Sequence, residues 1–175
     1  MDKLSELTAR MEIERSLKRY ARSVDRRDYD TLLLCFHPDA TDEHGDFCGH
    51  ISGFIPWVKK RHENIPFSMH SISNIYIEFL DDKTAVVETY FIAHQRRPAP
   101  ASDGGNGELD IQTIGRYLDR FELRDGEWRV ARRRVVYDSS RVTPSTYTLP
   151  KIGVLGQRDE RDSSVALFKT GNFAD

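Results

Sequence analysis

One carboxylate is notable because it lies on the apolar face of a predicted helix. Residues 4–25 carry apolar side chains at a spacing of three or four, which is typical of an amphipathic helix. Asp25 follows Ala21 by four residues, so it lies at the edge of the same stripe. An exposed Asp at a helix end usually pairs with a neighbouring arginine in water. A buried one needs a hydrogen-bonding or cationic partner.

His70 is a candidate for that partner. The segment SMHSISNIYIEFL changes from helical spacing to alternation, which predicts a strand with His70, Ile72, Asn74 and Tyr76 on one face. A carboxylate bound to one imidazole nitrogen fixes the tautomer and leaves the other nitrogen as a general base. Each residue alone is more often structural, and the sequence leaves open whether the two side chains meet.

A cationic side chain is the third candidate. The last predicted strand reads EWRVARRRVVYD, and alternation places Arg133 on one face with Ala131 and Val135. A buried guanidinium could stabilise a developing anion or a leaving group. A cross-strand ion pair between Arg133 and Asp119 or Glu122 is an equally strong expectation.

Several other kinds of site are not indicated. The segment HPDATDEHGDFCGH holds four His or Cys residues and four acids, but its spacing fits no zinc or calcium loop. We find no phosphate-binding glycine loop, nucleophile elbow or dinucleotide fingerprint. The net charge of −2 argues against binding to nucleic acid, and the two cysteines are too few for a disulfide framework. The apolar runs are too short to span a membrane. We therefore expect a cytoplasmic protein without metal or cofactor.

The predicted elements form one α+β domain. Three helical segments, over residues 4–25, 28–36 and 52–65, come before long antiparallel strands that start at Phe67. Between the second and third helical segments, FHPDATDEHGDFCGH reads as a turn and a short strand. A Pro- and Gly-rich segment, residues 97–108, predicts a mobile loop at one end of the sheet. We expect the domain to cover residues 1–142, with 143–175 an extension packed on it or on a neighbouring subunit.

The motifs RYARSVDRRDYDTLLLCFHPDA, SMHSISN and GRYLDRFELRDGEWRVARRRVVYD together resemble the SnoaL-like branch of the NTF2-like superfamily, from about Leu4 to Asp138. The resemblance implies a cone-shaped barrel in which a curved, mostly antiparallel sheet and N-terminal helices enclose an apolar pocket. Members include scytalone dehydratase, hexachlorocyclohexane dehydrochlorinase and bile-acid 7α-dehydratase, which are cofactor-free lyases with an Asp–His dyad, and also γ-formaldehyde lyases.

The resemblance also implies roles for individual residues. Asp25 and His70 match the dyad, and Tyr20 matches a tyrosine five residues before the dyad Asp. Arg133 matches the arginine that assists departure of the leaving group. If the match is shifted by one residue, that role falls to Arg132 or Arg134 instead. The expected substrate-binding side chains are His94, Tyr137, Trp57, Tyr76, Asn74, Phe54 and Tyr90.

The predicted function is a cofactor-independent lyase that acts on a hydrophobic aromatic or polycyclic alcohol, by a dehydratase or formaldehyde-lyase type of elimination. An isomerase or cyclase that uses the same base is the first alternative. A non-catalytic ligand-binding protein, such as a dioxygenase β subunit, is the second. Members of this branch are often oligomeric, so we expect a homodimer or homotrimer.

Overall fold

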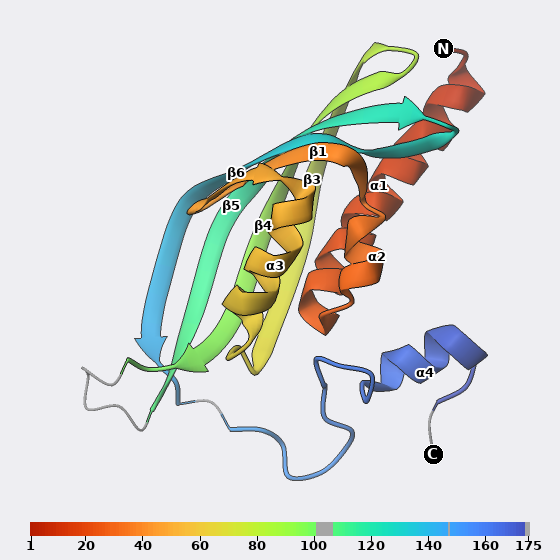
Figure 1. The fold of residues 1–175 in the computed structure, drawn as a ribbon. Helices are drawn as coiled ribbons and strands as arrows, with labels where there is room; N and C mark the ends of the chain where they lie inside the picture. The colour runs from red at the N-terminus through yellow and green to blue at the C-terminus, as the bar shows by residue number, and fades with distance from the viewer. Residues whose placement is uncertain (101–106, 147, 174–175) are drawn as a thin grey trace.

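The computed structural model describes residues 1–100, 107–146 and 148–173. Four helices and six strands occur in these ranges, with the helices mainly at the N-terminal end (Figure 1). In chain order they are α1 (Lys3–Arg26), α2 (Tyr29–Leu33), β1 (Phe36–His44), β2 (Phe47–His50), α3 (Ile51–His62), β3 (Phe67–Asp81), β4 (Thr84–Pro98), β5 (Glu108–Arg124), β6 (Glu127–Pro144) and α4 (Ser163–Thr170).

The strands form one curved, mixed sheet in the order β2-β1-β6-β5-β4-β3 (Figure 1). All pairs are antiparallel except β1 with β6, which run parallel. The predicted α+β class is confirmed. The sheet is not closed into a full barrel, because β2 and β3 remain as its edges.

Helix α1 forms where its sequence predicts and is closed at both ends. The Asp2 side chain accepts a hydrogen bond from the Ser5 amide, and Arg27 ends the helix in a left-handed conformation with φ 55°. The apolar stripe of α1 packs against β3 and β6, so its last turn delivers Asp25 to the sheet.

The segment that follows α2 contains two strands where the sequence predicted one. Strands β1 and β2 form a hairpin whose turn contains Gly45 at φ 66°. Helix α3 then packs across this hairpin through Phe54, which is fully buried. This packing places one face of α3 opposite the inner face of the sheet.

A bulge in β3 changes which side chains face inward. His70 and Ile72 are partly buried, as predicted, but Asn74 adopts φ 44° at a register shift between β3 and β4. Beyond this point Ile77 is buried, whereas Tyr76 is 64% exposed. The predicted placement of Asn74 and Tyr76 on the face of His70 is therefore wrong.

Strand β6 contains a second bulge. Its pairing with β5 shifts between Val130 and Arg132, which leaves Ala131 as the extra residue. Val130 and Arg133 are both buried, although strict alternation assigned them to opposite faces.

The segment after β6 returns to the helical side of the domain. Helix α4, which was not predicted, lies near the C-terminal end of α1 (Figure 1). The Arg22 side chain of α1 contacts Ser164 and Phe168 of α4. Most of the predicted mobile loop, residues 101–106, lies outside the described residues. No helix in the described ranges is long and apolar enough to cross a membrane.

Candidate active site

The structure brings Asp25 and His70 into direct contact. Asp25 Oδ1 lies 2.7 Å from His70 Nδ1, and Asp25 Oδ2 accepts a hydrogen bond from the His70 backbone amide at 2.7 Å. Ser68 Oγ donates a third hydrogen bond to Asp25 Oδ1 at 2.9 Å. The carboxylate is thus fixed by one short stretch of β3, and it fixes the imidazole in turn.

This arrangement determines the proton positions on the imidazole. Burial alone would raise the pKa of Asp25, but hydrogen bonds from His70 and Ser68 outweigh it, so the pKa lies below its usual value. In the tautomer whose Nδ1–H donates to the ionised Asp25, Nε2 keeps its lone pair. No described residue forms a hydrogen bond with Nε2. An imidazole held in this way can accept a proton at Nε2.

His70 lines a small cavity of about 60 Å³. Its wall includes α1, α3 and the inner faces of β1, β3, β4, β5 and β6, with aromatic side chains from several of them. These aromatic residues are Tyr20, Trp57, Phe91, Tyr117 and Tyr137. A second depression of about 280 Å³ shares Arg61 and Gln95 with the cavity and leads away from it toward the surface.

Tyr20 lies in the cavity wall as a neutral phenol. It packs edge-on against Tyr117 at 5.5 Å between ring centroids, and both side chains are almost fully buried. Burial raises the pKa of each hydroxyl well above its usual value. Each phenol therefore keeps its proton at neutral pH and can act as a hydrogen-bond donor.

Arg133 does not line the cavity. Its Nε and Nη2 donate to the two oxygens of Asp119, both at 2.7 Å, and both side chains are fully buried. The guanidinium also lies 4.0 Å from the Tyr20 ring centroid and 4.4 Å from that of Tyr117. Burial acts to lower the pKa of Arg133, but Asp119 outweighs it and keeps the group charged. The cross-strand ion pair is thus formed, and a direct contact between Arg133 and a substrate is not supported.

Five of the predicted substrate-binding residues do not line the cavity. The side chains of Asn74, Tyr76, Tyr90 and His94 are exposed on the outer face of the sheet. The exposure of Asn74 and Tyr76 follows from the β3 bulge. Tyr90 and His94 are exposed because they alternate with inward-facing residues of β4. Phe54 is buried in the core beneath Trp57. Trp57 and Tyr137 do line the cavity.

Three side chains near the dyad were not predicted from the sequence: Ser68, Arg158 and His62. Ser68 could have been found, because it precedes His70 by two residues on the same face. Arg158 donates to the carbonyl oxygens of Val24 and Asp25 at 2.9 Å, and its Nη2 lies 2.9 Å from His62 Nδ1. Nothing in the unpatterned segment around Arg158 indicated this contact.

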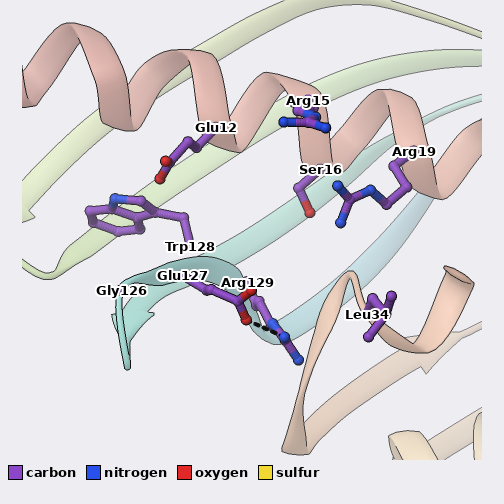
Figure 2. Close-up of a pocket in the computed structure, with 9 residues that line it drawn as sticks. All are labelled: Glu12, Arg15, Ser16, Arg19, Leu34, Gly126, Glu127, Trp128 and Arg129. Carbon is purple, nitrogen blue, oxygen red and sulfur yellow. Dashed lines mark hydrogen bonds and ion pairs between the residues drawn. The ribbon is translucent and has the colours of Figure 1, made fainter.

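A separate groove lies between α1 and the start of β6 (Figure 2). It has a volume of about 210 Å³ and is lined by Glu12, Arg15, Ser16, Arg19, Leu34, Gly126, Glu127, Trp128 and Arg129. Its charged groups form no arrangement comparable to the dyad, and it shares no lining residue with the cavity. Within the described ranges, no group of three or more His, Cys, Asp or Glu could hold a metal ion.

Comparison with solved structures finds the same fold. The dehydrochlorinase LinA-type3 from Novosphingobium barchaimii is 18% identical with a TM-score of 0.72, over 85% of this chain and all of that one. A candidate scytalone dehydratase from Novosphingobium aromaticivorans is 20% identical with a TM-score of 0.69, and the match covers 85% of this chain and 94% of that one. The β subunit of a candidate aromatic-ring-hydroxylating dioxygenase from the same species is 18% identical with a TM-score of 0.57, and the match covers 77% of this chain and 92% of that one.

These three similarities concern the fold, since their identities are low. No curated protein matches the chain. The model of the SnoaL-like domain matches residues 5–134, which include both members of the dyad. The chain therefore belongs to the SnoaL-like domain family and has the fold of the NTF2-like superfamily.

Proposed function

We propose that the protein is a cofactor-independent lyase in which Asp25 and His70 form the general base of an elimination. The observation that supports this most strongly is the 2.7 Å contact between Asp25 Oδ1 and His70 Nδ1 at the wall of a cavity. A purely structural Asp–His pair would not need to line a cavity.

In the proposed reaction, His70 Nε2 removes a proton from a carbon of the substrate. The electron pair of that C–H bond forms a C=C bond, and the C–O bond at the neighbouring carbon breaks. Asp25 stabilises the imidazolium that forms and keeps its orientation. The neutral phenols of Tyr20 and Tyr137 are available to donate hydrogen bonds to a substrate carbonyl or hydroxyl oxygen.

The aromatic wall favours a hydrophobic, aromatic alcohol as substrate. A cavity of about 60 Å³ has room for a few water molecules, whereas ligand sites are commonly about 300–1,000 Å³. We infer that the reacting carbons occupy the cavity and that the rest of the substrate extends past Arg61 and Gln95 into the larger depression. Trp57, over whose ring Arg61 lies at 5.3 Å, would move to admit it.

The similarity to a dioxygenase β subunit raises a non-catalytic role as a second candidate. Such a role needs no polar pair in the cavity, and separated Asp25 and His70 side chains would have favoured it. The short Asp25–His70 contact instead favours catalysis.

The experiment is a mass-spectrometric screen of the purified protein against β-aryl-β-hydroxy ketones, arylpropane diols and steroid alcohols. Loss of water or formaldehyde by the wild type, and no loss by His70→Ala, would support the lyase. Incorporation of solvent deuterium without loss of mass would indicate an isomerase or cyclase. Equal turnover by both proteins would refute the dyad, and no reaction with any compound would favour a binding role.

A further inference from the structure

A second acidic group lies buried near the cavity and is not explained by the dyad. Asp42 of β1 is fully buried, and neither of its carboxylate oxygens has a hydrogen-bond partner among the residues that the structure describes. Leaving an ionised carboxylate buried without a partner costs several kcal/mol. The fold is therefore expected to place a cation or a proton donor near Asp42.

The neighbouring arginine does not provide that hydrogen bond. Arg133 is opposite Asp42 in the pairing of β1 with β6, but it donates its hydrogen bonds to Asp119. One buried cation thus faces two buried carboxylates. A further positive charge would balance this group of side chains.

His44 is placed to supply that charge. Its Nδ1 lies 3.8 Å from Asp42 Oδ2, is buried, and has no hydrogen-bond partner in the described part of the chain. The ring packs against Trp57 at 5.4 Å and Tyr137 at 6.3 Å between centroids. His44 also lines the same cavity as His70. Two imidazoles, each beside a carboxylate, therefore contribute to one small cavity from different strands.

We propose that His44, charged through Asp42, is the general acid that protonates the leaving oxygen, while His70 is the base. This inference rests on the proposed function. The two histidines differ in their surroundings. Asp25 accepts hydrogen bonds from Ser68 and the His70 amide, whereas Asp42 accepts none from the described residues and has His44 Nδ1 at 3.8 Å. The unpartnered Asp42 carboxylate therefore favours a shared proton on the His44 side of the cavity, opposite the base.

The assignment completes the balance of the elimination. As the C–O bond breaks, its electron pair stays on oxygen, and that oxygen takes the proton from His44 Nε2. Water is the leaving product, His70 holds the proton taken from carbon, and His44 becomes neutral. Exchange with solvent restores both histidines, and no oxidant or reductant is required.

The protonation state of His44 can be measured without a substrate. Besides Asp42, the charged or titratable groups around it are Arg133 and Tyr137 from β6, Arg61 and His62 from α3, and His70 across the cavity. NMR of the full chain, with labelled histidine ring nitrogens, should show His44 with protons on both nitrogens at about pH 7. Asp42→Asn should return His44 to the neutral form. A neutral His44 in the wild type, or a state unchanged by Asp42→Asn, would overturn the proposal.

A leaving-group comparison tests the catalytic role. His44→Gln should lower kcat/KM about 100-fold for a β-aryl-β-hydroxy ketone, and only a few-fold for the β-acetoxy counterpart, whose leaving group needs no proton. His70→Ala should lose both reactions, and the exposed His50→Gln serves as the matched control. Equal losses with both substrates would overturn the general-acid role. No turnover by the wild type would count against the lyase, and the NMR result would still decide the charge of His44.

Discussion

His62 provides a stability test of the buried contact between α1, α3 and the C-terminal segment. The imidazole is 4% exposed and lies against the Arg158 guanidinium. Burial, and then the positive charge of Arg158, lower the pKa of His62 from 6.5 to about 3. The folded protein therefore keeps His62 neutral at a pH at which the unfolded chain would protonate it.

The sign and size of the effect follow from this difference in pKa. Between about pH 6.5 and pH 3 the unfolded chain binds more protons at this site, so the free energy of unfolding falls as the pH is lowered. With these two pKa values, the His62 contribution falls by about 2 kcal/mol between pH 7 and pH 5. Most carboxylates remain ionised over this interval, so it isolates the histidines.

The assay is urea unfolding of the wild type and His62→Gln at pH 7 and pH 5. The Gln amide oxygen can still accept the Arg158 hydrogen bond but does not titrate. The variant should therefore retain about 2 kcal/mol that the wild type loses, and His50→Gln should behave as the wild type. An identical loss in His62→Gln and the wild type would refute the reasoning.

Three further substitutions test other parts of the molecule. Arg133→Met should lower the free energy of unfolding by about 3–5 kcal/mol in urea, because Asp119 is left buried without its partner. The double variant Arg133→Met with Asp119→Leu should recover much of this stability. A decrease of less than about 1 kcal/mol in Arg133→Met would contradict the burial argument. Gly115→Ala should prevent soluble expression, since its Cβ would lie 2.3 Å from the Val136 carbonyl oxygen; a normally folded variant would show that β5 and β6 can separate there. Asp25→Asn should lower turnover at least 100-fold with circular dichroism unchanged, because the His70 tautomer is no longer fixed; unchanged turnover would exclude a role for the carboxylate.

The sequence predicted the three N-terminal helices and the α+β class, and it made His70 a candidate partner for Asp25. These features depend on local periodicity: the stripe of α1 and the first residues of β3 both keep their expected spacing. The prediction failed where one extra residue reverses the alternation of a strand. Asn74 and Ala131 each introduce such a bulge, and neither has a flanking pattern that marks it.

The remaining features depend on contacts between distant segments. Arg158 reaches the end of α1 from a segment without periodicity, and Asp42 lies opposite Arg133 only because β1 pairs with β6 in parallel. The sequence presented HPDATDEHGDFCGH as a group of polar residues without a clear arrangement. In the fold, β1 turns Asp42 inward and places His44 at the cavity wall.

The most direct test of the central claim is chemical rescue of His70. With a substrate that the wild type converts, His70→Ala should lose about 100-fold to 10,000-fold in kcat, and added imidazole should restore part of this activity. Imidazole should not restore activity to Asp25→Asn, in which the ring is still present. Full activity of His70→Ala without imidazole would contradict the account.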